Sequence, residues 1–307
     1  MRNSSRRFAS RATFLQGRTL PELPEVETVV RGLQMLLPGR RIAGIRLGKT
    51  DFIDDFAKLE EILPDSRISA VRRHGKFIVL LLEKPAPAQT APKSPAARFH
   101  FIVHLGMTGQ LTVFPSSRPS PLHTHVWISL DNDTELRFTD PRRFGRMLVL
   151  PEEQSESVLG PLGIDPLDVS AQQFQERLAA KRARIKAVLL DQRVFRGMGN
   201  IYTDESLWRA RIHPARLASA LKREEVARLH RAMQRILLEA IRLGGSSISD
   251  YVNAEGQPGE FQIRHRVYQR EGKKCTRCGA LIRRVIVAGR SSYFCPKCQR
   301  APRQRQK

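Results

Sequence analysis

Apolar and polar residues alternate over short stretches in the first half of the chain, as they do in strands that bury one face. Before these stretches, residues 26–37 carry apolar side chains at helical spacing, with acids in the first turn and a Pro38-Gly39 stop. The strand-like stretches are bounded by Gly, Pro and Asp turns and cover residues 42–47, 67–73, 77–82, 99–105, 126–130, 135–139 and 147–150. This order predicts an N-terminal β-sandwich with a flanking helix.

The second half of the chain has a helical period instead. Ser170 and Gln173 have the spacing of a capping box, and residues 185–190 and 202–209 continue with amphipathic patterns. A longer helix is predicted over residues 224–243, where Gly244-Gly245 ends it. The pattern as a whole therefore predicts an α+β, multidomain protein with a C-terminal helical bundle.

Two segments rich in proline interrupt these patterns. Residues 159–167 have the Pro and Gly density of an interdomain linker, and residues 84–97 read as a surface insertion without chemistry. The domain ranges that we expect are 1–20 for an extension, 21–150 for the sandwich, 151–169 for the linker, 170–262 for the helical domain and its following loop, 263–300 for a cysteine-rich ribbon and 301–307 for a basic tail.

The charge narrows the class of partner. Lys and Arg outnumber Asp and Glu by 53 − 30, which gives a formal net charge of +23. Such a chain favours a polyanion, although ribosomal and membrane-surface proteins can be equally basic, so charge alone selects phosphate-rich ligands in general. No apolar run approaches the roughly 20 residues that a membrane-spanning helix needs, and we expect no membrane partner.

All four cysteines fall in one C-terminal cluster. The spacing is Cys275-x2-Cys278 and Cys295-x2-Cys298, with 16 residues between the pairs that include two apolar runs around Gly289. Paired knuckles of this kind predict a zinc ribbon in which four thiolates hold one Zn²⁺ and leave no position for water, so the metal is expected to be structural. Redox pairs or disulfides are the alternative, which the double knuckle spacing disfavours, and the lack of scattered cysteines fits a reducing compartment.

Two further motifs carry a resemblance to a known family. Residues 21–28 read PELPEVET and residues 191–205 read DQRVFRGMGNIYTDE. With the cysteine ribbon, these motifs follow the order found in the bacterial formamidopyrimidine-DNA glycosylases, which the chain resembles over about residues 21–299. The resemblance implies a helix-two-turn-helix domain before the ribbon, and an enzyme that excises oxidised purines such as 8-oxoguanine and formamidopyrimidines from double-stranded DNA and cleaves abasic sites in base excision repair.

Pro21 is the residue on which this chemistry depends. An internal proline nitrogen is a tertiary amide without a proton, whereas a terminal proline is a secondary amine with a pKa of roughly 8 against about 10.4 for lysine. Only the free amine can attack a sugar carbon and form an iminium. The resemblance implies that Pro21 attacks C1′ of an everted nucleotide, that Glu22 protonates the opening sugar ring, and that β- and δ-elimination follow.

The 20 residues before Pro21 contain five arginines and no acid. We favour a start assigned too early, with the true initiator at Leu20 and removal of the initiator methionine before Pro21. An organelle transit peptide that is cleaved before Pro21 is the second alternative, and a genuine extension that blocks the amine is the third. On the favoured interpretation the enzyme works in the bacterial cytoplasm and associates with the nucleoid through DNA.

The resemblance also assigns residues that contact DNA phosphates. Lys76, at the entry to a strand, and Arg290, at the expected hairpin tip, match phosphate-binding family residues, and Lys76 also assists catalysis. Glycines at 197 and 199 permit close backbone approach, so that the following helix start and Asn200 can meet a phosphate. By charge or spacing alone, these residues would be ordinary surface and turn positions.

A second set of residues is expected to fill the space that an everted nucleotide leaves. The family supplies them from segments that here read HLGMTG and DPRRFG, which give Met107, Arg142 and Phe144. Composition alone would make Met107 and Phe144 core residues, but the glycines in both segments predict loops. Residues 245–262 resemble the flexible loop that closes over the everted base. The histidines form no metal or nucleophile pattern, and we assign them no catalysis.

Two other functions compete with this one. An endonuclease VIII-like glycosylase would prefer oxidised pyrimidines, and LPEVET together with the Met107, Arg142 and Phe144 set favours the purine enzyme. A lesion-binding protein without catalysis would result if Pro21 stayed blocked. In each case we expect a monomer that binds damaged duplex DNA.

Overall fold

The computed structural model describes residues 21–86, 96–248 and 251–302. The expectations for residues 1–20, for most of the insertion, for two positions of the closing loop and for the end of the tail lie outside these ranges. None of the helices within them is long and apolar enough to cross a membrane.

Contacts divide the chain into two compact units, each built from separate stretches of sequence. The first, which we call the sandwich unit, contains Pro21, Glu25–Pro161 and Ser246–Gly259. The second, the helical unit, contains Glu22–Pro24, Leu162–Gly245 and the chain from Glu260 onward. The chain therefore changes unit at the beginning of its first described helix, α2 (Leu23–Leu36).

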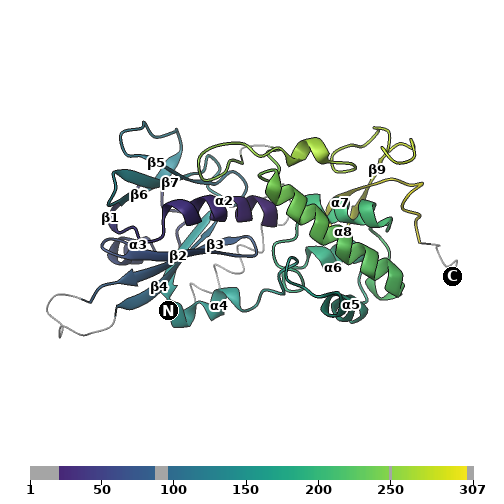
Figure 1. The fold of residues 1–307 in the computed structure, drawn as a ribbon, viewed down its shortest axis with the longest axis horizontal. Helices are drawn as coiled ribbons and strands as arrows, with labels where there is room; N and C mark the ends of the chain where they lie inside the picture. Colours follow the sequence, from purple (N-terminus) through teal and green to yellow (C-terminus); the bar gives the residue numbers. More distant parts are fainter. Residues whose placement is uncertain (1–20, 87–95, 249–250, 303–307) are drawn as a thin grey trace. The chain divides into compact units, whose positions relative to one another are not determined.

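The sandwich unit is built on two four-stranded antiparallel sheets (Figure 1). One sheet has the order β1-β6-β7-β5 and the other has the order β2-β3-β4-β8. The strands are β1 (Ile42–Leu47), β2 (Arg67–His74), β3 (Phe77–Lys84), β4 (Ala97–His104), β5 (Gln110–Pro115), β6 (Thr124–Leu130), β7 (Thr134–Thr139) and β8 (Arg146–Pro151). The unit also contains α3 (Phe56–Ile62), the 3-10 turn η1 (Glu152–Gln154) and α4 (Glu156–Leu159).

One apolar core holds this unit together. Side chains from both sheets meet in it, including Leu80 and Phe101 from one sheet and Ile128 and Phe138 from the other, all at most 1 % exposed. The buried face of α2 joins the same core through Val26, Val29, Val30 and Leu33. Burial of each such side chain stabilises the fold by about 1.5–3 kcal/mol. The predicted β-sandwich with a flanking helix is confirmed.

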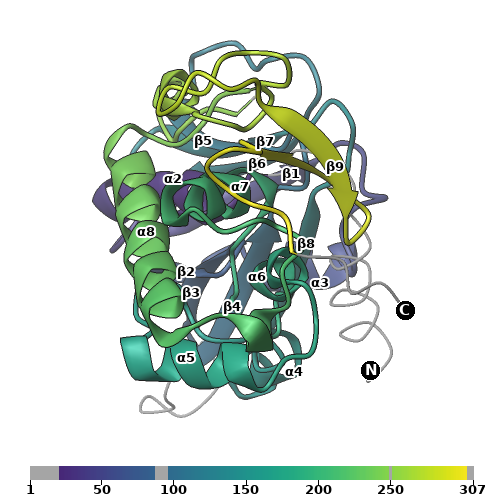
Figure 2. The same ribbon diagram turned by 90° about the vertical axis from the view of Figure 1, so that its right-hand side faces the viewer.

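The helical unit contains four α-helices among the described residues. Figure 2, which is turned by 90° from Figure 1, shows them. They are α5 (Ala171–Ala179), α6 (Ile185–Leu190), α7 (Asn200–Ala210) and α8 (Arg223–Arg242). Two 3-10 turns, η2 (Ala218–Ala220) and η3 (Phe261–Arg264), lie between or after them. The capping box predicted at the start of α5 is present, because Ser170 accepts from the Gln173 N–H and the Gln173 side chain accepts from the Ser170 N–H.

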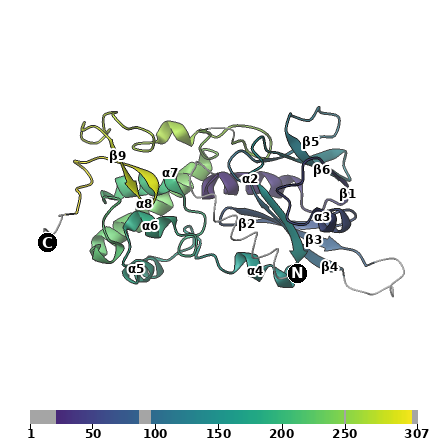
Figure 3. The ribbon, with the colours of Figure 1, turned by 180° about the vertical axis from the view of Figure 1, so that it is seen from behind.

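A two-stranded hairpin completes the helical unit. Strands β9 (Arg283–Val287) and β10 (Arg290–Phe294) pair antiparallel around Ala288 and Gly289, which both have positive φ, as a tight hairpin turn requires (Figure 3). The ribbon expected around Gly289 is therefore present. The α+β, multidomain fold class is confirmed in full.

Sequence patterns missed β5, α3, η1 and α4 of the sandwich unit. Strand β5 lies at the edge of its sheet, next to β7 among the described strands, and ends at Pro115, a residue that edge strands tolerate. Its six residues lie between a Gly-rich segment and a Pro/Ser-rich one, which hides the alternation of Leu111 and Val113. Helix α3 has seven residues and buries only Leu59 and Ile62, too few for a clear helical period.

Candidate active site and metal centre

Glu22 follows Pro21 directly and lies at the N-terminus of α7. It is 2 % exposed, and its two carboxylate oxygens accept hydrogen bonds from the backbone N–H groups of Ile201 at 2.9 Å and Tyr202 at 3.3 Å. The first amides of a helix generally need acceptors from outside it, and the positive end of the helix dipole favours a negative charge there. The carboxylate of Glu22, the residue that follows Pro21 in the chain, is thus held in one position on α7.

The glycines before α7 make this position available. A Cβ at residue 199 would lie 2.2 Å from the Glu22 carboxyl carbon, and one at residue 197 would lie 2.9 Å from the Leu23 Cβ. Gly197 also has a φ of +90°, and its carbonyl accepts the Leu23 N–H at 3.0 Å. The two glycines that we interpreted as a phosphate approach therefore admit Glu22 and Leu23, and the first amides of α7 are already occupied by Glu22.

Asn200 and Arg290 lie in the same part of the helical unit. The Asn200 side-chain amide donates to the Ser291 carbonyl at 3.1 Å, which connects the start of α7 to β10. Arg290, the first residue of β10, is half-buried. Burial lowers the pKa of its guanidinium, while the negative charge of Glu22 acts in the opposite direction. Glu22, Asn200 and Arg290 therefore lie in one part of the helical unit.

A buried ion pair that the sequence analysis missed supports this arrangement. Lys186 on α6 and Asp204 on α7 have fully buried side chains, with Nζ and Oδ1 2.6 Å apart. Lys186 also donates to the Ser291 carbonyl at 2.9 Å, and Asp204 accepts from the Tyr293 N–H at 2.9 Å. The pair therefore binds two alternate residues of β10. The signal in the sequence is a lysine inside the apolar run IKAVLL, although the run does not show its partner.

Burial acts on both members of this pair. It raises the pKa of Asp204 to about 6, although the charge of Lys186 opposes the shift, and it lowers the pKa of Lys186. Glu205, the residue after Asp204, is also buried. Its side chain accepts hydrogen bonds from three consecutive backbone N–H groups, those of Arg266, Val267 and Tyr268, at 2.8–2.9 Å. Burial raises the pKa of Glu205, and the three amides oppose that shift. Helix α7 thus organises both the hairpin and the segment that precedes the cysteines.

The remaining candidate residues belong to the sandwich unit. They lie in the loops next to one end of the sheet β2-β3-β4-β8. Phe77 of β3 pairs with His104 of β4, and His104 pairs with Arg146 of β8. Lys76 directly precedes the first of these residues, Met107 follows the second by three positions, and Arg142 and Phe144 precede the third. The register of this sheet therefore gathers four candidates that are far apart in sequence.

His104 reports the charge at this end of the sheet. It is 4 % exposed, and burial lowers its pKa to about 3, with further lowering from the positive charges of Lys76 and Arg146. Its Nδ1 accepts the Gly106 N–H at 3.1 Å. The ring is therefore neutral, and it fixes the beginning of the loop that carries Met107.

The three residues expected to enter the DNA differ in exposure. Arg142 and Phe144 are half-buried, and the Arg142 guanidinium carbon lies 4.7 Å from the centre of the Phe144 ring. Met107 is only 9 % exposed, so its side chain has to turn outward before it can enter a base stack.

The described parts of the loop at 245–262 are bound to α2 and β5. Glu25 accepts the Ser246 N–H at 2.7 Å through its side chain, and its carbonyl accepts the Tyr251 hydroxyl at 3.1 Å. The Ala254 carbonyl accepts the Val113 N–H at 2.9 Å. Ala254 also packs against α2, because a Cβ built at Gly32 would lie 2.7 Å from the Cβ of Ala254. Glu25, an acid in the first turn of α2, therefore also holds this loop.

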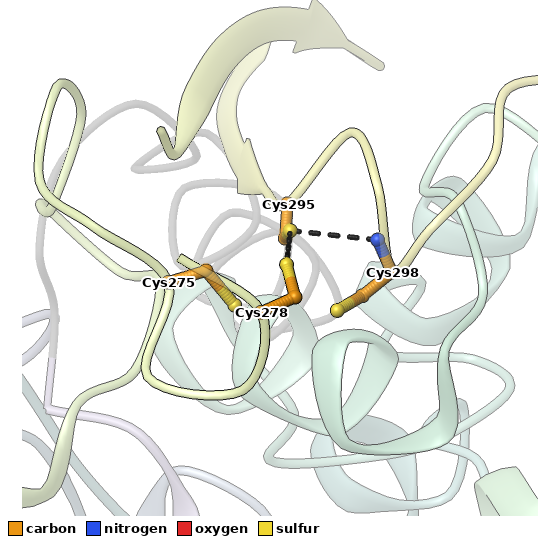
Figure 4. Close-up of side chains that lie close together, drawn as sticks. All are labelled: Cys275, Cys278, Cys295 and Cys298. Carbon is orange, nitrogen blue, oxygen red and sulfur yellow. Dashed lines mark hydrogen bonds between the residues drawn. The ribbon is translucent and has the colours of Figure 1, made fainter. Parts of the chain in front are cut away.

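The four cysteines form a site of the size that zinc requires (Figure 4). Their sulfur atoms all lie within 4.8 Å of one another, and the Cys278 and Cys295 sulfurs are 3.4 Å apart. Zn–S bonds of about 2.3 Å in a tetrahedron separate sulfurs by about 3.8 Å. Four thiolates complete the coordination, so the site holds one structural Zn²⁺ with no open position.

The cysteine site packs on the end of α7. Trp208, Val267 and Ile282 form one apolar cluster with Cys275 and Cys295. Cys295 also belongs to a polar link, in which its N–H donates to the Gln299 side chain and Gln299 in turn donates to the Ile212 carbonyl at 2.9 Å. Metal binding therefore stabilises the base of the hairpin that carries Arg290.

Comparisons with known proteins agree over most of the chain. Three family models match, described as the formamidopyrimidine-DNA glycosylase N-terminal domain at residues 20–147, its H2TH domain at 162–252, and a zinc finger found in FPG and IleRS at 272–301. A formamidopyrimidine-DNA glycosylase of Solibacter usitatus is 44 % identical over 283 residues, which cover 92 % of this chain and 100 % of the relative.

Solved structures show the same similarity. The Lactococcus lactis Fpg in complex with DNA that contains an abasic site matches with a TM-score of 0.80 and 34 % identity, over 91 % of this chain and all of the other. A variant of the same enzyme in complex with Fapy-dG DNA matches with a TM-score of 0.81 and 34 % identity, over 92 % of this chain and all of the other.

Proposed function

This chain belongs to the formamidopyrimidine-DNA glycosylase family, and from that premise we propose that its working form begins at Pro21 and uses the nitrogen of that residue as the nucleophile. The chain removes oxidised purines from duplex DNA in base excision repair and cleaves the resulting abasic site. The observation that carries the proposed mechanism is the carboxylate of Glu22, directly after Pro21, held by two amides of α7.

In the first step, the nitrogen of Pro21 replaces the damaged base at C1′ of the sugar. The amine of Pro21 forms a bond to C1′ of the everted nucleotide and loses its proton, the glycosidic bond breaks, and the base leaves with a proton. Glu22 protonates the ring oxygen O4′ as the ring opens, which yields a positively charged iminium at C1′. A carboxylate next to the nucleophile can serve both the nitrogen and the ring oxygen.

The iminium then withdraws electrons from the sugar. Loss of a proton from C2′ breaks the C3′–O bond and releases one phosphate, and a second elimination breaks the C5′–O bond and releases the other. Water then hydrolyses the iminium and frees Pro21. The product is a gap of one nucleotide with phosphates on both sides.

Positive and apolar side chains support these steps in our proposal. Lys76 and Arg290 bind phosphates beside the lesion, and Asn200 at the start of α7 approaches the same DNA backbone. The positive charges of Lys76 and Arg146 lower the pKa of His104, which marks this end of the sheet as positively charged. Arg142 faces the base that has lost its partner, while Met107 and Phe144 enter the stack. Zinc contributes structure, through Cys275, Cys278, Cys295 and Cys298.

The setting of this activity is a further proposal. The curated relatives that match over most of the chain are bacterial enzymes. We infer that this protein acts in the cytoplasm on chromosomal DNA, and we keep the six sequence-based ranges as the proposed domain scheme.

Borohydride trapping tests the terminus and the activity together. A protein that starts at Pro21 should form a covalent complex with 8-oxoguanine DNA when the iminium is reduced. A protein that retains residues 1–20 should bind that DNA without cross-linking, because an internal proline has no free amine. Mass spectrometry of the cross-linked peptide identifies the attached residue.

Two results would contradict the proposal. Cross-linking by the longer protein with an intact Met1 would show that another amine attacks. Full activity of a Pro21→Gly variant whose terminus has been acetylated would do the same. Efficient cleavage at thymine glycol with none at 8-oxoguanine would instead favour the endonuclease VIII-like function.

A further inference from the structure

Two loops of the sandwich unit carry the residues proposed to enter the DNA. The methionine loop (residues 105–109) connects β4 to β5, and the arginine loop (residues 140–145) connects β7 to β8. They are more than 30 residues apart in sequence. Nothing in either loop alone explains how Met107 on one and Arg142 with Phe144 on the other would act in concert.

Asp140, the first residue of the arginine loop, connects the two. Its side chain is fully buried, at 0 % exposure. Oδ1 accepts the Thr108 hydroxyl from the methionine loop and, at 3.3 Å, the Arg142 N–H from its own loop. Oδ2 accepts the Gly145 N–H at 2.8 Å. Each oxygen of this carboxylate is therefore committed to a loop donor.

The backbones of the two loops also touch. Gly106 has a φ of +64°, and a Cβ there would lie 2.3 Å from the Phe144 carbonyl carbon and 2.5 Å from the Gly145 nitrogen. The Phe138 ring lies below both loops, because a Cβ at Gly109 would approach it to 2.9 Å and one at Gly145 to 2.5 Å. The two loops therefore pack too closely at Gly106 to admit a side chain between them.

We propose that Asp140 is a positioning residue that joins the methionine and arginine loops into one body, so that Met107, Arg142 and Phe144 enter the duplex together. A carboxylate suits this task because it only accepts, and the Thr108 hydroxyl and both amides need acceptors. The inference rests on the proposed DNA-inserting role of those three residues, and it adds the device that couples them.

The coupling should matter most when a base has to be everted. Extrusion of a stacked nucleotide costs unstacking energy, which inserted side chains can offset, whereas an abasic site has no base to unstack and extrudes at lower cost. Loss of the Asp140 contacts should therefore slow excision of 8-oxoguanine and have a smaller effect on cleavage of a preformed abasic site in the same duplex.

Thr108→Val provides the sharpest variant. Valine has the shape of threonine and lacks the hydroxyl, so only the hydrogen bond between the loops is lost. Thr108→Ser keeps that hydroxyl and is the matched control. We expect the ratio of single-turnover 8-oxoguanine excision to abasic-site cleavage to fall about tenfold in Thr108→Val, the effect of losing one hydrogen bond to a charged acceptor. Thr108→Ser should restore the ratio to within about twofold.

Asp140→Asn tests the centre of the network. Asparagine can accept at only one of the two positions and places an NH₂ group against the other donor or hydroxyl, so the ratio should fall further than in Thr108→Val. Fluorescence of 2-aminopurine beside the lesion reports insertion directly. Its increase on binding of wild-type protein should be reduced in both variants.

The outcomes separate this inference from the proposed function. If the unmodified protein beginning at Pro21 fails to excise 8-oxoguanine, the proposed function fails. If it is active but Thr108→Val and Asp140→Asn leave the ratio and the 2-aminopurine signal unchanged, the coupling is wrong. Equal losses of both activities, in step with a lower melting temperature, would also overturn it, because they would show a purely structural role.

Discussion

Glu22 owes its position to two residues that have no side chain. Gly199 leaves the space that the Glu22 carboxyl group occupies, and Gly197 leaves the space for Leu23. Helix α7 then supplies the hydrogen bonds that hold the carboxylate. The orientation of the proposed general acid thus depends on backbone geometry in a distant segment of the sequence.

Gly199→Ala tests this dependence. The new Cβ would lie 2.2 Å from the Glu22 carboxyl carbon and must displace it from the Ile201 and Tyr202 amides. An acid that is out of position loses a contribution of about a hundredfold or more, so single-turnover excision of 8-oxoguanine should fall by that factor. Affinity for a reduced abasic-site duplex should change far less.

Gly44→Ala is the matched control. Gly44 lies in β1, where a Cβ would meet nothing within 4 Å, and the same substitution should leave excision within about twofold of the parent. Retention of full excision by Gly199→Ala would show that the carboxylate position is irrelevant to the reaction.

At this scale, local motifs identified the chemistry but not its supports. PELPEVET and the two cysteine knuckles indicated Pro21, Glu22 and the zinc ligands because neighbours in sequence carry those signals. Lys186 with Asp204, and Asp140 with Thr108, were not predicted, because each partner looks ordinary until the fold brings it to the other. The same applies to His104, whose neutral state comes from burial and from Lys76 and Arg146.

The β9–β10 hairpin is the element on which Arg290 depends. Hydrogen bonds with Lys186 of α6 and with Asn200 and Asp204 of α7 attach strand β10 to the helices. The base of the hairpin is fastened by the cysteine site, which packs against Trp208. Because one attachment consists of hydrogen bonds and the other is a metal site, each can be disrupted separately.

Removal of zinc should release the base of the hairpin. Metal binding contributes roughly 10–16 kcal/mol to folding in zinc-finger peptides, so a chelator should unfold the ribbon locally. Affinity for abasic-site DNA should fall about tenfold or more, the value of one charge-assisted contact. Re-addition of Zn²⁺ should restore it.

The two tryptophans of the chain make this test selective. Trp208 packs in the cysteine cluster and lies under the Arg277 guanidinium at 4.1 Å, whereas Trp127 lies on β6 of the sandwich unit. Chelation should change the Trp208 emission, which a Trp127→Phe variant isolates, and leave Trp127 unaffected in a Trp208→Phe variant. Unchanged DNA affinity of the metal-free protein would contradict the role given to the ribbon.

Elements with a strong period were predicted well, and weak ones were not. Helices α5 to α8 and seven of the eight sandwich strands follow from periodicity and turn residues. Strand β5 and helix α3 were missed because each buries few side chains. The meeting of Lys76 with the methionine and arginine loops at one end of a sheet follows from strand register, which no local pattern specifies.

For the whole molecule, His104 predicts a sensitivity to acid. The pKa of His104 is about 3 in the folded protein and 6.5 for an ordinary histidine. Between these values the unfolded chain is protonated at His104 and the folded protein is not. The resulting stability is complete above pH 6.5 and declines as the pH falls toward 3. At pH 5 the loss should be about 2 kcal/mol.

Urea unfolding at pH 7.5 and pH 5 measures this loss. The Trp208→Phe background leaves Trp127 to report the sandwich unit. His104→Asn offers an oxygen to the Gly106 N–H and does not titrate, so its midpoint should depend less on pH than that of the parent. Parallel decreases in both proteins would assign the acid sensitivity to other groups.

The division of the sequence between the two units has a consequence for attempts to recombine this enzyme. Each unit draws on segments that the other interrupts, so a cut at residues 161–162 does not yield two self-sufficient halves. The N-terminal fragment would lack Tyr251 and Ala254, which bind Glu25 and Val113, and the C-terminal fragment would lack the Glu22 that caps α7. A chimera with a homologue must therefore exchange residues 25–161 and 246–259 as a matched set, while residues 22–24 must travel with the helices.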